Sequence, residues 1–152
     1  MSPTNSETAA DELALESQVC FALAVASRRV ISLYRPLLEP MGLTHPQYLV
    51  MLALWQHKQL TVRQLSELVS LDPATISPLL KRLESTGYIS RHRDPDDERT
   101  LMVTATGEGR ALRARALAIP PAIRGQLQMD ADQLQHLHAL LSDVIDRSDP
   151  SR

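Results

Sequence analysis

Cys20 is the only cysteine in this 152-residue chain. A single thiol cannot form a disulfide within the chain, so Cys20 is either inert packing or a chemical sensor. Inert packing is the commoner fate of a cysteine on an apolar helical segment. A reactive thiol needs solvent access and neighbours that favour the thiolate. The choice between the two depends on what Cys20 controls, and therefore on the elements around it.

The composition describes one domain with an aliphatic core. Hydrophobic residues make up 43% of the chain and aromatic residues 3%, and 152 residues suit a single domain. No apolar run of roughly 18 residues is present, which excludes a membrane span, and no signal segment begins the chain. A chain with one cysteine does not fit a disulfide-stapled secreted domain, so we expect it in the reducing cytoplasm.

Basic residues gather in the middle of the chain, although the net charge is −2. Half of them lie between Lys81 and Arg115, while acidic residues dominate both ends. An anionic partner such as a nucleic acid would therefore meet the middle segment.

The first element is a predicted helix. Apolar residues recur at helical spacing from Leu13 to about Tyr34, and Pro36 interrupts the pattern. Cys20 would then lie roughly two turns into the helix, where the helix dipole gives little help to a thiolate.

Three start signals mark helices in the middle segment. Two are capping boxes, in which a threonine and a glutamine three residues later satisfy each other's backbone N–H groups, and the third is an aspartate before a proline. They lie at Thr44 with Gln47, Thr61 with Gln64, and Asp72 with Pro73. The last of these helices ends at Gly87. The second and third helices form a helix-turn-helix.

A β-hairpin and two more helices complete the predicted fold. The β-prone runs 88–93 and 100–104 flank the short charged loop 94–99, and a hairpin directly after a helix-turn-helix is a wing. Thr104 is expected to cap a long helix that runs toward Pro120, and a final helix covers about residues 131–145. The fold class is mainly α with a small β-hairpin wing, a winged helix-turn-helix.

The second helix of the motif has the side chains that DNA reading requires. Short polar residues at its start let the backbone sit close to base edges, and a basic pair one turn later can reach guanines or phosphates. The alternative is that this basic pair only solvates a helix face. The predicted DNA-binding helix residues are Asp72, Thr75, Ser77, Pro78, Lys81 and Arg82.

The wing strengthens the DNA-binding interpretation. Arg91, Arg93 and Arg99 alternate with acidic residues in and around the loop. Arg99 at the tip would enter a minor groove, and we expect the Asp97 carboxylate to hold its guanidinium by charge-assisted hydrogen bonds. The alternative is an ordinary solvated turn.

The segment LTVRQLSELVSLDPATISPLLKRLESTGYISRHRDPDDERTLMVTATGEG resembles the winged-helix core of the MarR superfamily of bacterial repressors. The resemblance implies an intertwined helical homodimer whose two heads read the halves of a pseudopalindromic operator in double-stranded DNA. It implies a single domain over 11–147, with dimerisation helices at 11–43 and 105–147 and the winged helix-turn-helix at 44–104. Residues 1–10 and 148–152 would be a flexible N-terminus and a flexible tail.

The stretch around Cys20, QVCFALAVASRRVISLYRPLLEPMGLTHPQYLVMLALW, resembles the organic hydroperoxide sensors of this superfamily. The resemblance makes Cys20 the peroxide-reactive cysteine, whose oxidation to a sulfenic acid releases the DNA. Because the chain has no second cysteine, the sulfenic acid would react with a small cellular thiol or oxidise further. Phe21, Leu23 and Trp55 would supply an apolar neighbourhood that favours organic hydroperoxides.

Tyr34 and His45 are the thiol-activating residues that this resemblance suggests. Tyr34 lies about 21 Å from Cys20 along a straight helix, so a contact requires the Tyr34 of the other subunit. His45 stands where such sensors usually have a second tyrosine. A protonated imidazole would favour the thiolate more than a phenol would. The alternative is that His45 faces solvent at a helix start.

The resulting function is a redox-sensing repressor of peroxide-resistance genes, with no metal and no cofactor. The alternative is a MarR-type repressor released by a small lipophilic or phenolic ligand, with Cys20 inert. A thiol peroxidase is disfavoured because no resolving cysteine supports turnover, so we expect no enzyme. A metal sensor is disfavoured because His136 and His138 point to different faces of their helix.

Overall fold

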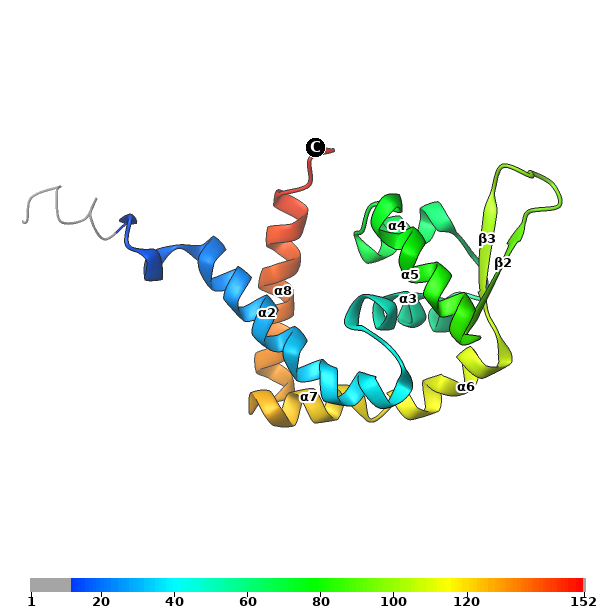
Figure 1. The fold of residues 1–152 in the computed structure, drawn as a ribbon. Coiled ribbons are helices and arrows are strands. Elements are labelled where there is room, and N and C mark those ends of the chain that lie inside the picture. The colour runs from blue at the N-terminus through cyan, green and yellow to red at the C-terminus, as the bar shows by residue number, and fades with distance from the viewer. Residues whose placement is uncertain (1–11, 152) are drawn as a thin grey trace, which may run out of the picture.

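The computed structural model describes residues 12–151 (Figure 1), so the predicted flexible segment 1–10 lies outside the described residues. It confirms the mainly helical fold with a small β-sheet wing. The elements are η1 (Leu15–Ser17), α2 (Val19–Leu38), η2 (Glu39–Met41), α3 (His45–Gln56), β1 (Leu60–Thr61), α4 (Val62–Val69), α5 (Pro73–Thr86), β2 (Ile89–Arg93), β3 (Leu101–Ala105), α6 (Gly107–Ala116), α7 (Ile119–Leu127) and α8 (Ala131–Arg147). None of the helices in this part of the chain is apolar over enough length to cross a bilayer.

The predicted start signals of the central helices are confirmed. Both capping boxes form: the Thr44 N–H donates to Gln47 Oε1 at 2.9 Å, and the Thr61 N–H donates to Gln64 Oε1 at 2.9 Å. Gly87 ends α5 with a φ of 91°, a left-handed conformation that glycine adopts without strain.

The first helix differs from the prediction at both ends. It begins at Val19 rather than Leu13, because Gln18 has an extended backbone and residues 15–17 form a separate 3-10 turn. It continues through Pro36 to Leu38, which is 1% exposed. Pro36 removes only one N–H near the helix end, and the packing of Leu38 on the core keeps the last turn helical.

The helix after the wing is also different. β3 extends to Ala105, and Thr106 rather than Thr104 caps α6, accepting a hydrogen bond from the Gly109 N–H at 3.1 Å. The predicted long helix is two helices, α6 and α7. Pro120 and Pro121 lack the N–H groups that would bond the carbonyls four residues earlier, which explains the break.

The sheet has the strand order β1-β3-β2, with both pairs antiparallel. β2 and β3 form the predicted hairpin, in the register that pairs Arg91 with Val103. The apolar residue Leu60 is part of the short strand β1. This strand pairs with β3, and Leu60 lies opposite Val103. This third strand holds the hairpin base against the helices and completes the winged helix-turn-helix from α3 to β3, which is called the head below.

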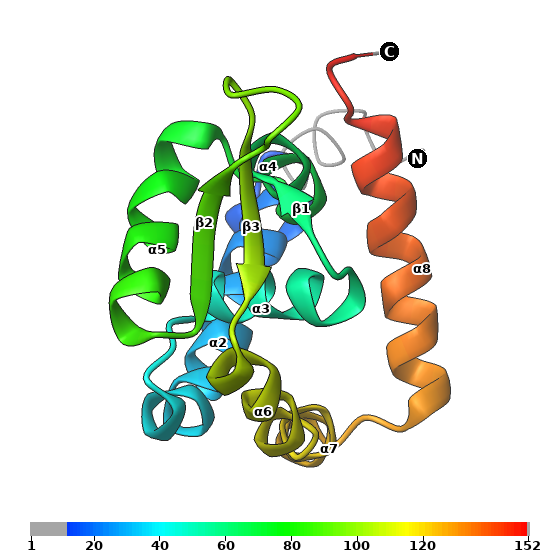
Figure 2. The same cartoon turned by 90° about the vertical axis from the view of Figure 1, so that its right-hand side faces the viewer.

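The head and helix α8 bury very different amounts of apolar surface. The core residues Met51, Leu65, Ile76, Leu80 and Val103 are fully buried within the head. Helix α8 has no buried residue and stands apart from the head in both views (Figures 1 and 2). Its apolar side chains remain uncovered: Leu137 is 42% exposed, Leu140 54%, Val144 45% and Ile145 65%.

Gly109 marks the closest approach between α6 and the wing. A Cβ atom placed there would lie 2.0 Å from the Tyr88 carbonyl oxygen, whereas one at Gly125 in α7 would meet nothing within 4 Å. The fold therefore requires glycine at position 109 for a steric reason.

We predict opposite effects for two glycine-to-alanine variants. Gly109→Ala should lower the free energy of unfolding by about 3 kcal/mol or more, because the backbone of α6 must move away from Tyr88. Gly125→Ala should raise it by about 0.5 to 1 kcal/mol, as expected for alanine in a helix interior. Urea denaturation followed by circular dichroism measures both, and equal effects of the two variants would contradict the close approach.

Candidate functional site

Helix α5 presents the predicted recognition residues on its open face. Thr75, Ser77, Pro78, Lys81 and Arg82 are all exposed, while the opposite face is buried in the head core. The Pro78 ring lies on this open side, so the missing N–H leaves an exposed carbonyl that water can satisfy. The structure therefore brings the predicted set onto one accessible helix surface.

Asp72 fixes the start of α5. Its Oδ1 accepts the Thr75 N–H at 2.8 Å. The pKa of this carboxyl lies below its ordinary value, chiefly because of the hydrogen bonds from Thr75. The negative charge of this exposed carboxylate also interacts favourably with the positive N-terminal end of the helix dipole. Asp72 thus orients the recognition helix.

Arg91 links the wing to α5. Its Nε and Nη2 donate to the two oxygens of Glu84 at 3.3 and 3.2 Å, and its backbone N–H donates to the same carboxylate at 3.1 Å. Arg91 holds the pKa of Glu84 below its ordinary value, mainly through the side-chain hydrogen bond. Glu84 is not predicted from the sequence as part of this site. Its only signal there is an acidic residue on an otherwise basic helix, seven positions before Arg91.

The expected role of Asp97 toward the Arg99 guanidinium is wrong. Asp97 Oδ1 accepts the backbone N–H of Arg99 at 3.1 Å, and Oδ2 accepts the Thr100 hydroxyl at 3.1 Å. A short carboxylate two residues before an arginine reaches the turn backbone more readily than the end of the long side chain. Asp97 therefore shapes the wing tip, and the side chains of Arg93 and Arg99 remain exposed there.

Cys20 is exposed and occupies the first turn of α2. The prediction that it lies two turns inside the helix is wrong, because the helix begins at Val19. Backbone N–H groups in a first helical turn have no intrahelical acceptor, and they favour negative charge. The side chains beside it are also open: Val19 is 71% exposed and Phe21 41% exposed.

Tyr34, His45 and Tyr48 form an aromatic cluster where α2 meets the start of α3. The ring centroids of Tyr34 and His45 are 5.0 Å apart, and those of Tyr34 and Tyr48 are 5.8 Å apart. Burial raises the pKa of the Tyr34 phenol, and burial together with Tyr34 raises the pKa of Tyr48. Both phenols therefore keep their protons and can donate hydrogen bonds.

His45 is half-buried in this cluster, not a solvent-facing residue. Burial lowers the pKa of its imidazole, so the neutral ring is favoured. The predicted advantage of a protonated imidazole over a phenol therefore applies only below the lowered pKa of this ring. A neutral imidazole can still donate one hydrogen bond.

Cys20 and Tyr34 lie on one face of α2, because fourteen positions at about 100° each bring the side chains to within roughly 40° of one another around the axis. They are separated by about four turns of a continuous helix, so they do not meet within one chain. Trp55 does not join them, because its indole N–H binds the Gly109 carbonyl at 2.8 Å.

Comparison with known proteins decides the family. The model of the SarA/Rot transcriptional regulator family matches residues 32–115. An organic hydroperoxide resistance transcriptional regulator of Bacillus subtilis is 38% identical over 136 residues, covering 90% of this chain and 92% of the relative. The chain belongs to the MarR superfamily of winged-helix transcriptional regulators.

Solved structures agree with this assignment. A probable transcriptional regulator of Pseudomonas aeruginosa superposes with a TM-score of 0.79 at 31% identity, covering 87% of this chain and all of that one. Overoxidised AbfR bound to DNA superposes with a TM-score of 0.73 at 29% identity, covering 90% of this chain and 96% of that one. This MarR-type protein is therefore a DNA-binding regulator and not an enzyme.

A metal-sensing MarR-type site has no support in the described residues. Between residues 12 and 151, no group of three or more histidine, cysteine, aspartate or glutamate side chains is arranged to hold a metal ion. His138 instead lies 3.5 Å from the Ser142 hydroxyl on the exposed side of α8.

The lowered pKa of His45 predicts how stability depends on pH. The unfolded chain takes up a proton near the ordinary histidine pKa of about 6.5, whereas the folded regulator resists it, so proton uptake favours unfolding. The contribution of His45 to the free energy of unfolding is complete above about pH 6.5 and is lost as the pH falls from there through the lower pKa of the folded state.

We expect His45→Gln to flatten the fall in melting temperature between about pH 7 and pH 5. Thermal unfolding in buffers across this range measures the slope. His138→Gln on the surface of α8 is the matched control and should retain the wild-type slope. A steeper or unchanged slope for His45→Gln would contradict the effect of burial.

Proposed function

We propose that this regulator is a repressor that leaves its operator when an organic hydroperoxide oxidises Cys20, and that it controls peroxide-resistance genes. The single observation that carries the proposal is the exposed thiol in the first turn of α2. A thiol in a first helical turn lies where free backbone N–H groups favour the thiolate, the form that attacks a peroxide. Similarity to the hydroperoxide resistance regulator supports the same conclusion.

The oxidation step is a two-electron transfer. The thiolate sulfur attacks the terminal oxygen of the hydroperoxide, the O–O bond breaks, and the alkoxide takes a proton and leaves as the alcohol. The sulfur is oxidised to a sulfenic acid and the peroxide is reduced. A small cellular thiol then attacks this sulfur, forming a mixed disulfide and releasing water. The apolar side chain of Phe21 beside the thiol favours an organic peroxide over hydrogen peroxide.

The repressor would act as a homodimer. Uncovered apolar side chains on α8, together with Val19 and Ile31 on α2, need a partner surface. A second copy of the chain supplies a matching apolar stripe in a two-fold arrangement. Two heads related in this way would read the two halves of a pseudopalindromic operator, with α5 in the major groove and Arg93 and Arg99 at the backbone or minor groove.

The sensor site would be shared between subunits. Cys20 and Tyr34 lie on one face of α2, so antiparallel pairing of the two α2 helices would place the thiol of one subunit beside the aromatic cluster of the other. The phenol of Tyr34, which keeps its proton, would donate to the thiolate. Oxidation adds an oxygen atom at this junction and would change the spacing of the two heads.

A relative provides a parallel for redox chemistry on DNA. AbfR, a protein of Staphylococcus epidermidis, has been crystallised on DNA in a reduced form and in an overoxidised form. AbfR is 29% identical to this chain in each case. This supports the oxidation state of the protein as the regulated variable here.

Cys20→Ser tests the proposal against release by a ligand with an inert cysteine. In an operator gel shift, cumene hydroperoxide should release the wild-type protein and leave the bound fraction of Cys20→Ser unchanged, because serine cannot form a sulfenic acid. Hydrogen peroxide should be less effective at equal concentration. Release of Cys20→Ser by the hydroperoxide would reject the proposal.

Mixed dimers test the shared site. Cys20→Ser and Tyr34→Phe should each oxidise slowly or not at all as homodimers, whereas a mixed dimer holds one complete site with Cys20 from one subunit and Tyr34 from the other. Oxidation at half the wild-type amplitude and near the wild-type rate is expected, measured by mass spectrometry of the sulfenic acid trapped with dimedone. A mixed dimer as slow as the Tyr34→Phe homodimer would show that the site is not shared.

A further inference from the structure

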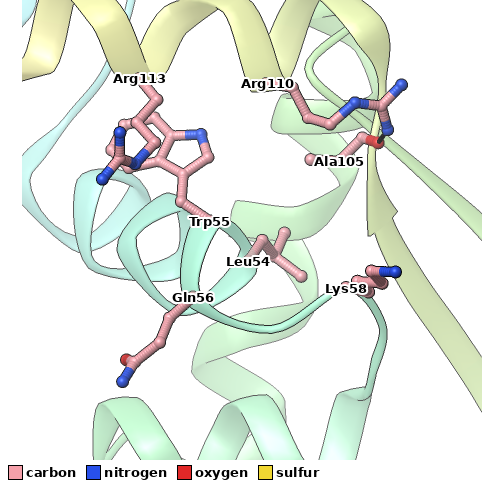
Figure 3. Close-up of a pocket in the computed structure, with 7 residues that line it drawn as sticks. All are labelled: Leu54, Trp55, Gln56, Lys58, Ala105, Arg110 and Arg113. Atoms are coloured by element: carbon pink, nitrogen blue, oxygen red, sulfur yellow. Dashed lines mark hydrogen bonds between the residues drawn. The ribbon is translucent and has the colours of Figure 1, made fainter.

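A cleft lies between the end of α3, the base of the wing and α6 (Figure 3). Its volume is about 660 Å³, within the range of small-molecule sites. The lining includes Trp55 and Lys58 beside α3, Ala105 at the end of β3, and Arg110 and Arg113 on α6. The redox mechanism and the recognition surface use none of these side chains.

The charge of the cleft is entirely positive. Lys58, Arg110 and Arg113 contribute three cations, and the lining holds no carboxylate. Within residues 12–151 none of the three forms a salt bridge, whereas Arg63, Arg91 and Arg147 each do. Arg110 and Arg113 lie one turn apart on α6 and line the cleft on different sides: Arg113 lies beside Trp55, whereas Arg110 turns toward Ala105, on the side of Lys58 (Figure 3). Cations that line one cleft without counter-ions favour a negatively charged ligand.

The donors of the cleft are partly pre-oriented. Arg110 Nη1 donates to the Ala105 carbonyl at 2.8 Å, which fixes the guanidinium and leaves its other N–H groups free. A fixed guanidinium offers paired donors that match the oxygens of a phosphate.

Trp55 supplies a flat apolar wall. Its indole N–H is already satisfied by the Gly109 carbonyl at 2.8 Å, so only the ring surface is available to a ligand. The residue is half-buried, and Leu54 beside it is also apolar. Aromatic faces of this kind stack on planar rings, including nucleic acid bases.

The position of the cleft separates it from both sites described above. Ala105 is at the end of β3 opposite the wing tip that carries Arg99, so operator DNA bound at the tip and α5 would not occupy the cleft. Cys20 begins α2, and no residue of α2 lines the cleft. A ligand here would contact the head and α6 together.

We propose that this cleft binds a small aromatic phosphate ester, such as a purine mononucleotide. The ring would lie on Trp55, and the phosphate, which is close to a dianion at neutral pH, would lie beside Lys58 and Arg110 on the other side of the cleft. The proposal is independent of the oxidation of Cys20.

Trp55 is the only tryptophan of the chain, so intrinsic fluorescence reports on the cleft directly. Titration of the full-length protein with AMP should quench this emission in a saturable way, and calorimetry should give the same dissociation constant. Adenosine, which has the ring but no charge, should bind about tenfold more weakly or worse, the loss expected for one charge-assisted hydrogen bond. Equal affinity for adenosine would overturn the proposal.

Lys58→Gln is the decisive variant because the exposed Lys58 side chain makes no hydrogen bond or salt bridge within the described residues, so its loss should not affect folding. We expect AMP affinity to fall about tenfold. Arg124→Gln on α7, which makes the same change of charge outside the cleft, should bind AMP as the wild type does, and so should Cys20→Ser. Unchanged affinity in Lys58→Gln, or an equal loss in Arg124→Gln, overturns the site. If Lys58→Gln instead weakens operator binding and leaves AMP unaffected, the cleft is a DNA contact and the proposal is wrong.

Discussion

The contact between α6 and the base of the wing is the constraint on which the rest of this structure depends. Thr106 donates its hydroxyl proton to the Gly87 carbonyl and its backbone N–H to the Tyr88 carbonyl, and Trp55 binds the Gly109 carbonyl. The two backbones come so close at Gly109 that no larger residue fits. As a result, hydrogen bonds and close packing hold three parts together as one unit: the end of α5, the base of the wing and the start of α6.

A second contact joins the same unit to α2. The Tyr88 hydroxyl donates to the Met41 carbonyl at 2.6 Å, and Arg115 donates to the Pro40 carbonyl at 3.1 Å. Both acceptors lie directly between α2 and α3, beside the aromatic cluster of Tyr34 and His45. These hydrogen bonds therefore fix α6 and the start of the wing to the turn that joins the two helices carrying the aromatic cluster.

The best-predicted elements are the helices whose ends depend on interactions between residues close together in the sequence. Capping boxes, an N-terminal proline and a terminal glycine act within a few residues, so α3, α4 and α5 were placed almost to the residue. The start of α2 was misplaced because apolar periodicity continues through Leu15, while only the extended backbone of Gln18 separates the 3-10 turn from the helix. Glu84 with Arg91 and Trp55 with Gly109 were missed because they depend on how distant segments pack. The recognition face was predictable from residue types, but the partners of Asp97 were not.

The uncovered stripe of α8 has a consequence for the protein inside a cell. If a second copy covers that stripe, part of the free energy that keeps each chain folded comes from association, and it follows protein concentration by mass action. A repressor present in few copies would then exchange subunits more readily and lose folding stability as its concentration falls. The shared sensor would exist only while two chains are paired, so a diluted chain would lose operator reading and peroxide detection in the same step. There would therefore be a minimum concentration of this protein below which neither operator binding nor peroxide detection takes place.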